Sequence, residues 1–141
     1  MKKMKYLLMA LACLMSSNAM AGDNPIPVEK LPQAAKAFVQ ANFKGQKIVF
    51  AEKDWNSFDC LLADGTKIEF DKKGDWQSVD RDRTAVPAAI VPKTIQEYVK
   101  ANFPNCVVTQ IEKERYGFDV EFVNDITLKF NKQGKFLGMK R

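Results

Sequence analysis

Five carboxylates lie at equivalent or adjacent places in two halves of the chain and are the side chains best suited to acid–base chemistry: Asp54, Asp59, Glu112, Glu114 and Asp119. Acids placed beside lysines at strand ends are ordinarily solvated charges rather than tuned catalytic groups. The chain contains no histidine, which excludes serine–histidine and cysteine–histidine catalysis and every histidine-containing metal site. The sequence also lacks phosphate-loop, dinucleotide, nucleophile-elbow and calcium-loop spacings. We therefore predict a protein that is not an enzyme, with no catalytic residues, no cofactor and no metal site.

The first 21 residues have the pattern of an export signal. Three lysines fall within the first five residues, an apolar run covers 6–15, and Ala19-Met20-Ala21 is a small-x-small cleavage site. The apolar run is about half the length that spans a bilayer, which argues against a membrane anchor. Lipidation at Cys13 is a less favoured alternative, because no leucine stands three residues before it. We expect cleavage after Ala21 and a periplasmic or secreted protein.

The charge of the exported chain is nearly balanced. Removing the three lysines of the signal leaves 19 Lys+Arg (22 minus 3) against 17 Asp+Glu, a net charge of about +2. No cluster of basic residues remains that would indicate a nucleic-acid partner.

The exported chain would retain two cysteines, Cys60 and Cys106. An even count in an exported protein permits one disulfide, which would join the two halves of the chain and close a loop of about 45 residues. The alternative is two buried thiols, because neither cysteine has a counterpart in the other half. The sequence leaves both alternatives open.

The two halves are copies of one unit. Residues 31–81 align with 91–141 without a gap, and 13 of the 51 paired positions are identical. Self-similarity at a fixed offset indicates a duplicated module. A unit of this size would be marginally stable alone. We therefore predict a first repeat over 22–82 and a second over 83–141, both in one compact domain.

Each repeat is predicted to contain one helix followed by four strands. Pro32 and Pro92 suit the first turn of a helix, and apolar residues then recur at i, i+3, i+4 and i+8. The strands are expected at 47–54, 57–63, 66–70 and from 75, and at 107–114, 116–123, 126–130 and from 135. Asp64-Gly65, Asn124-Asp125 and the two D/N-K-x-G segments are hairpin turns.

Alternation along these strands assigns two faces to the sheet. Apolar residues such as Phe58, Ile68 and Phe70 would lie under the helix, and polar residues would occupy the opposite, open face. The predicted fold class is α+β, with two tandem α-β-β-β-β repeats, an antiparallel sheet and the helices on one face. The sheet is one continuous, curved sheet if the repeats join edge to edge.

This layout resembles the PepSY-like, beta-lactamase-inhibitor-like family of small secreted bacterial proteins. The resemblance rests on the export signal, the tandem units, the P-x-x-x-x-x-[FY]-V-x-A-N-F helix and the strand series closed by [DN]-K-x-G, and it covers 31–141. It implies a periplasmic or surface protein that is not an enzyme. By fold analogy alone, it also implies a concave sheet suited to gripping another protein.

Aromatic residues outside the helical stripe are candidates for a binding surface. Trp76 and Phe136 occupy equivalent positions, and we expect them to cap the core on the helix side. Trp55 is the better surface candidate, because Lys53, Asp54 and Asn56 surround it.

We predict a secreted binding module that holds an envelope protein or peptide on its open sheet face, as a monomer or weak homodimer without a membrane span. A polar face of mixed charge provides specificity more than affinity. The alternative is a periplasmic protein that binds a small ligand or ion in a cleft between the repeats. The residues predicted to bind the protein partner are Trp55, Asp59, Lys67, Glu69, Tyr116, Asp119, Glu121 and Lys129.

Overall fold

A computed structural model describes residues 24–141. The predicted signal peptide, its cleavage site after Ala21 and Cys13 lie outside the described residues. Eight strands form one antiparallel sheet in chain order, β1 to β8, with two α-helices. The α+β class with four strands per repeat is therefore confirmed. The chain divides into two compact units between Ser78 and Val79, within β4; the repeat boundaries, a shared single domain and the curvature of the sheet stay predictions.

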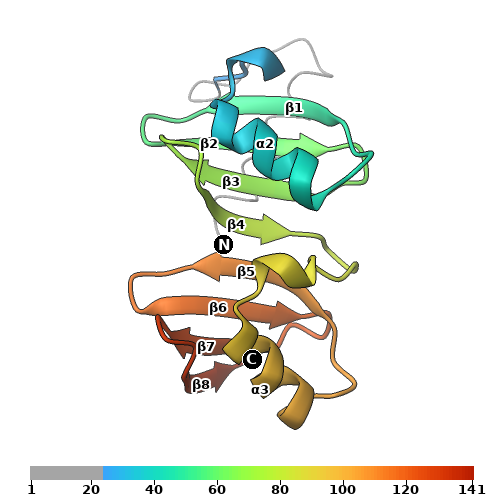
Figure 1. Cartoon of the computed structure of the whole chain (residues 1–141), viewed down its shortest axis with the longest axis vertical. Coiled ribbons are helices and arrows are strands. Elements are labelled where there is room, and N and C mark those ends of the chain that lie inside the picture. Colours follow the sequence, from blue (N-terminus) through green and yellow to red (C-terminus); the bar gives the residue numbers. More distant parts are fainter. Residues whose placement is uncertain (1–23) are drawn as a thin grey trace. The chain divides into compact units, whose positions relative to one another are not determined.

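The first unit contains one helix on one side of its strands (Figure 1). Its elements are η1 (Val28–Lys30), α2 (Gln33–Asn42), β1 (Ile48–Lys53), β2 (Ser57–Leu62), β3 (Lys67–Asp71) and the start of β4 (Trp76–Asp80). Antiparallel pairing places Phe58 opposite Phe70 and Cys60 opposite Ile68. These pairs lie on the helix side, where Cys60, Ile68 and Phe70 are completely buried.

The second unit repeats this arrangement. It contains η2 (Ala88–Ile90), α3 (Lys93–Asn102), β5 (Val108–Lys113), β6 (Gly117–Phe122), β7 (Thr127–Asn131) and β8 (Phe136–Lys140). The helix α3 lies on one side of these strands (Figure 1). Its Ile95 is buried together with Ile111, Val120 and Leu128 of the strands. Every predicted strand is present, with ends that differ by at most two residues.

Aromatic stacking closes each core next to the fourth strand of the repeat. Trp76 stacks on Phe38 of α2 at 6.2 Å between ring centroids. Phe136 stacks on Tyr98 of α3 at 4.8 Å with an interplanar angle of 12°. The prediction that Trp76 and Phe136 cap the core on the helix side is confirmed.

The D/N-K-x-G hairpins pack against the start of the helix in the same repeat. Gly74 adopts a φ of +93°, and a Cβ added to it would lie 2.8 Å from Pro32 Cβ. Gly134 adopts a φ of +81°, and an added Cβ would lie 1.8 Å from the Thr94 hydroxyl oxygen. Glycine is required here for both backbone conformation and space. The close packing of each D/N-K-x-G hairpin against the start of its helix helps to position that helix over the strands.

The outer edge of β1 is partly covered by the chain that precedes η1. Pro25 forms an isolated antiparallel bridge with Glu52. The Ile26 N–H donates to Ala51 O at 2.9 Å, and the Lys53 N–H donates to Asn24 O at 2.8 Å. The first strand therefore has backbone partners on both sides.

Candidate functional site

The open face of the second repeat carries a row of charged side chains from neighbouring strands. Phe118 and Val120 of β6 point into the core, so the intervening Asp119 points to the opposite face. Pairing places Asp119 between Glu112 of β5 and Lys129 of β7. Side chains directly opposite on adjacent strands have Cβ atoms about 5 Å apart, so Asp119 is a direct neighbour of both Glu112 and Lys129.

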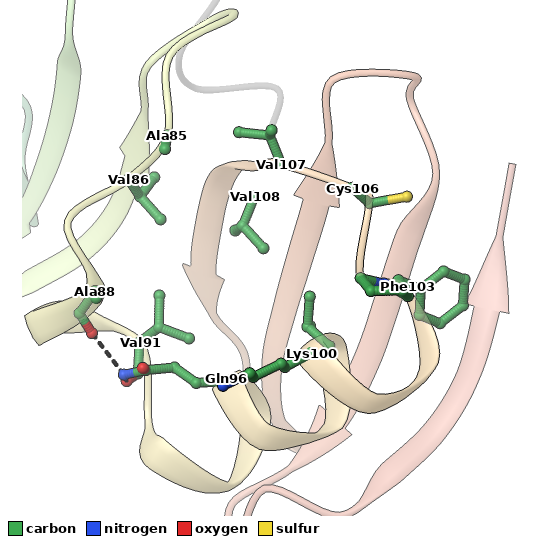
Figure 2. Close-up of a pocket in the computed structure, with 12 residues that line it drawn as sticks. Ala85, Val86, Ala88, Val91, Gln96, Lys100, Phe103, Cys106, Val107 and Val108 are labelled. Atoms are coloured by element: carbon green, nitrogen blue, oxygen red, sulfur yellow. Dashed lines mark hydrogen bonds between the residues drawn. The ribbon is translucent and has the colours of Figure 1, made fainter.

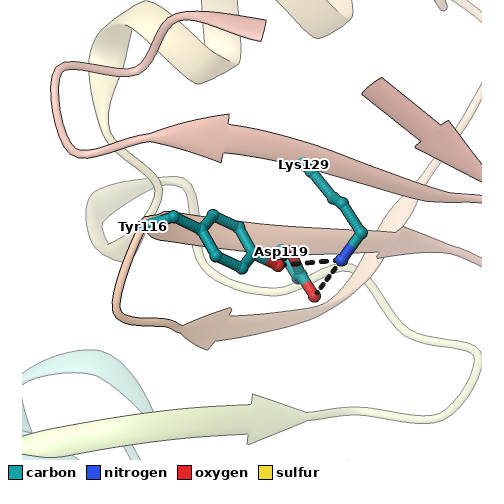
Figure 3. Close-up of polar contacts among 3 residues, drawn as sticks. All are labelled: Tyr116, Asp119 and Lys129. Atoms are coloured by element: carbon teal, nitrogen blue, oxygen red, sulfur yellow. Dashed lines mark hydrogen bonds and ion pairs between the residues drawn. The ribbon is translucent and has the colours of Figure 1, made fainter. Parts of the chain in front are cut away.

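Tyr116, Asp119 and Lys129 form a closed cluster of polar contacts (Figure 3). The Tyr116 hydroxyl donates to Asp119 Oδ1. Lys129 Nζ donates to Tyr116 Oη at 2.9 Å and to Asp119 Oδ2 at 3.3 Å. The ammonium also lies 5.1 Å from the centre of the Tyr116 ring, within the range of a cation–π contact. Three of the four residues predicted in this repeat are thus in direct contact.

Gly117 allows the hairpin between β5 and β6 to place Tyr116 beside the sheet. Its φ is +151°, and an added Cβ would lie 2.2 Å from the Phe130 carbonyl oxygen and from the Asn131 carbonyl carbon. A side chain at this position would therefore overlap the backbone of β7. The first repeat has Ser57 at the position equivalent to Gly117 and Asn56 at the position equivalent to Tyr116, so it has no tyrosine here.

Electrostatics keep both titratable donors of the cluster protonated at neutral pH. Burial and the hydrogen bond to Asp119 raise the pKa of Tyr116 above its usual value of 10.0. The hydrogen bond to Tyr116, followed by the charge of Asp119, raises the pKa of Lys129 above 10.5 although partial burial opposes this. Neither group is poised to accept a proton. The cluster therefore presents a fixed pattern of donors and acceptors, which suits binding.

Glu121, the fourth residue predicted in this repeat, lies on β6 two residues after Asp119 and on the same face of the sheet. It lines a polar hollow of 330 Å³, together with Asp80, Asp82, Arg83 and Asp125 among others. Burial and the charges of Asp125 and Asp80 raise the pKa of Glu121 above its usual value. Across residues 24–141, no group of three or more His, Cys, Asp or Glu side chains is placed to hold a metal ion.

The first repeat places carboxylates in the equivalent row. Asp59 pairs with Glu52 of β1 on one side and with Glu69 of β3 on the other, and all three side chains are buried. Lys67, also predicted, lies on β3 opposite Leu61. Sequence reasoning missed Glu52, although its identity with Glu112 in the other repeat was a usable signal.

Trp55 lies apart from this row. It occupies the hairpin between β1 and β2, and its side chain is 89% exposed. Its backbone N–H donates to Asp54 Oδ1 at 2.8 Å, and the side chain borders a hollow lined also by Pro25, Ile26 and Lys53. The structure therefore places the most exposed aromatic residue at a hairpin end, not on the sheet face.

A third hollow, which sequence reasoning missed, opens beside α3 (Figure 2). Its volume is 360 Å³, and its lining is mostly apolar, with Val86, Val91 and Phe103 among its residues. The Gln96 side chain donates to Ala88 O and Val91 O, each at 2.7 Å. Ala85, Val86 and Ala88, which precede α3 in the chain, form part of the wall of this hollow.

Both cysteines are free thiols in the structure. Cys60 is completely buried on the helix side of β2, and Cys106 is partly buried before β5. Burial, followed by the charge of Asp59, raises the pKa of Cys60. A buried neutral thiol behaves as a small apolar side chain.

The helices of the described part of the chain are too short or too polar to cross a membrane.

Comparisons with known proteins identify relatives that share this fold. A family model described as "Putative beta-lactamase-inhibitor-like, PepSY-like" matches residues 19–59 and 56–138. A Bacteroides thetaiotaomicron crystal structure, described as a "putative calcium-regulated periplasmic protein", is 35% identical with a TM-score of 0.79, and the match covers 84% of this chain and 97% of that chain. No curated protein matches.

Two Bacteroides vulgatus structures are also similar. One, described as a "putative periplasmic protein of unknown function", is 32% identical with a TM-score of 0.81, covering 85% of this chain and 100% of that chain. The other, described as a periplasmic protein of the DUF2874 family, is 35% identical with a TM-score of 0.79, covering 87% and 100%. The family model spans most of this chain. The chain therefore belongs to the PepSY-like, beta-lactamase-inhibitor-like family.

Proposed function

We propose that this protein is an exported, non-catalytic binding module that holds another protein or a peptide of the cell envelope on its open sheet face. Export rests on the signal pattern of residues 1–21 and on the periplasmic description of similar structures. The inhibitor-like description of the family supports a protein as the partner. The proposed residues are those predicted from the sequence, with Glu52 added; of these, Trp55 would contact the partner from the β1–β2 hairpin and not from the sheet face.

The observation that carries this proposal is the cluster of Tyr116, Asp119 and Lys129. Its side chains are held by one another, so little conformational entropy remains to be lost when a partner docks. Tyr116 is 38% exposed, and a partly exposed tyrosine in a fixed position is a typical centre of a binding hot spot. A protonated lysine and a carboxylate on either side add specificity.

The two repeats offer different charge patterns to a partner. In the first repeat the row consists of Glu52, Asp59 and Glu69, three carboxylates. In the second repeat the lysine at 129 replaces the third carboxylate. A partner segment that docks on the row of the first repeat would need basic groups opposite it. This asymmetry predicts recognition of one defined surface, since mismatched charges are rejected strongly.

The test is affinity capture from envelope extract with the chain 22–141, which includes every described residue. We expect a specific protein to be retained by the native chain and lost by the double variant Y116A/K129E. The matched control is Lys93→Glu, which makes the same charge reversal at an exposed position of α3. Circular dichroism must show that all three chains are folded.

Recovery of the same proteins from native and double-variant chains would contradict the proposed face. Tyr116→Phe refines the result, because it keeps the ring and removes the hydroxyl that joins Asp119 to Lys129. The alternative of a small-ligand protein stays a prediction, with no observation in its favour.

A further inference from the structure

We propose that the outer edge of β8 docks an extended, acidic segment of a partner protein as an additional antiparallel strand. The β8 edge is defined as the side of Phe136–Lys140 that faces away from β7. This site is separate from the open face described above, because strand addition uses the backbone of one strand and not the side chains of a sheet face.

Comparison of equivalent strands shows what the β8 edge lacks. The fourth strand of the first repeat, β4, has β5 as its next neighbour, whereas β8 is last in the strand order. Beyond β4, the Arg81 N–H donates to Thr109 O at 2.9 Å. Val79 of β4 is completely buried, and its counterpart Met139 of β8 is 53% exposed. The same position of the repeat is therefore buried in one copy and exposed in the other.

Backbone groups on the β8 edge are available for pairing. In an antiparallel pair, alternate residues bond to the neighbouring strand and the others direct their N–H and C=O groups outward. Among residues 24–141, no strand pairs with this side of β8. The edge of β1, in contrast, is bridged by Pro25. The sheet thus has one edge that is partly covered and one that is open.

Exposed apolar side chains accompany this open edge. Leu137 and Met139 are each 53% exposed. Leu137 is the extra residue of a bulge, because Lys129 pairs with Gly138 while Phe130 pairs with Phe136. An edge strand with exposed apolar residues is a template for another strand, and these two side chains would provide apolar contacts to it.

Charge decides which kind of strand fits. From Ile126 to Arg141 the chain has five basic residues and no acidic residue. The equivalent stretch of the first repeat, 66–81, has four of each. Lys135 directly precedes β8, Lys140 is its last residue, and both are exposed. Pairing of β8 with a second copy of β8 would bring like charges together. Lysines on edge strands commonly prevent such edge-to-edge pairing. An acidic strand would meet opposite charges.

The partner segment is therefore about five residues long, to match β8, with acidic residues near Lys135 and Lys140 and apolar residues near Leu137 and Met139. Extended peptides bind sheet edges through backbone hydrogen bonds, while side chains provide specificity. The segment needs no defined fold of its own.

The probe is a capped nine-residue peptide of alternating Glu and Val, titrated into ¹⁵N-labelled 22–141 and followed by amide chemical shifts. We expect the largest shifts at residues 136–140 and in β7. We expect affinity to fall by about tenfold when salt is raised from 50 to 300 mM. A matched Lys/Val peptide is expected to bind at least about tenfold more weakly.

A second peptide separates strand addition from simple charge attraction. N-methylation of the interior residues of the Glu/Val peptide keeps its charges and removes its backbone donors. We expect this peptide to lose at least about tenfold in affinity, because the added strand must pair with β8 through its backbone. Equal affinity of the two peptides would overturn the proposal.

Charge-reversed variants locate the site on the protein. Lys135→Glu with Lys140→Glu should weaken binding of the acidic peptide by at least about tenfold. The matched control, Lys72→Glu with Lys73→Glu, changes the net charge equally in an exposed turn of the first repeat and should bind like the native chain. Equal loss in both variants would overturn the proposal. The salt and N-methylation measurements on the native chain do not depend on the folding of either variant.

Two other outcomes would also overturn it. Shifts centred on Tyr116, Asp119 and Lys129 would show that the acidic peptide binds the open face. Sedimentation as a dimer, with shifts at 136–140 that depend on protein concentration, would show that a second copy occupies the β8 edge. The variant Y116A/K129E changes the open face and leaves β8 intact, whereas Lys135→Glu with Lys140→Glu changes only the β8 edge. The two proposals can therefore fail independently of each other.

Discussion

Asp119 and Lys129 face each other across β6 and β7, and the Lys129 ammonium lies 3.3 Å from the Asp119 carboxylate. The equivalent pair of the first repeat, Asp59 and Glu69, places two carboxylates opposite each other. One substitution between repeats thus converts a like-charge pair into an ion pair. Equivalent positions of the two repeats therefore differ in charge and in their side-chain contacts.

The ion pair contributes modestly to stability. Lys129→Glu removes two hydrogen bonds and places a carboxylate directly opposite Asp119, which already has Glu112 on its other side. Because Lys129 is partly exposed, solvent screening limits the loss to about 1 kcal/mol. Thermal unfolding should show a Tm lower by about 2–5 °C. Lys132→Glu, the same reversal in an exposed turn, is the control, and an equal drop there would contradict a specific role for the pair.

Alkaline pH should weaken the cluster. The pKa values of Tyr116 and Lys129 are raised in the folded chain above 10.0 and 10.5. The folded state therefore holds these protons more tightly than the unfolded state. Their contribution to stability is complete below about pH 10 and is lost as pH rises through the folded pKa values. Unfolding curves from pH 8 to 11 should show a steeper loss for the native chain than for Y116F/K129M. Parallel curves would refute this linkage.

Gly74 and Gly65 should respond differently to the same substitution. Their φ angles are +93° and +90°, but an added Cβ meets Pro32 and Ala35 only at Gly74. Gly65→Ala should lose about 1–2 kcal/mol through backbone strain alone. Gly74→Ala should lose about 2–4 kcal/mol, because overpacking against the start of α2 is added. Urea denaturation measures both values, and equal losses would show that the helix contact is not restrictive.

Alkylation should distinguish the two cysteines. Cys60 is completely buried and its pKa is raised, so little reactive thiolate reaches solvent. Iodoacetamide should label Cys106 at least about a hundredfold faster than Cys60 in the folded chain, as read by mass spectrometry. After unfolding, both should react. If neither reacts without a reducing agent, the two are joined by the disulfide that the sequence left open.

Local periodicity predicted most of the fold. The apolar stripe that includes Phe38 and Val39 indicated a helix, and the alternation of Phe58, Cys60 and Leu62 indicated a strand with one buried side. Proline before each helix and glycine in each D/N-K-x-G turn defined where elements begin and end. These signals depend only on residues that are close together in the chain, so they can be read from one sequence without the tertiary structure. Because the two repeats have the same pattern, each element was predicted independently in both copies.

The contacts within the site could be predicted only in part. Alternation assigned Asp119 and Lys129 to one face. Their contact with Tyr116 depends on the conformation of the hairpin at Gly117, which the hydrophobic periodicity of the sequence does not predict. Trp55 was read correctly as exposed, yet its position at a hairpin end depends on where β1 stops. Glu52 was overlooked, although it pairs with Asp59 close to the hairpin between β1 and β2 and is identical with Glu112 of the other repeat.

The sequence by itself determined the duplicated α+β repeat, the side of the sheet on which each strand residue lies, and membership of a family. Tertiary structure alone decided which of those residues touch, because pairing register, bulges and hairpin geometry set cross-strand neighbours. It also decided that Met139 is exposed where Val79 is buried. Equivalent residues share a local pattern, but their burial depends on the strand that lies beside them.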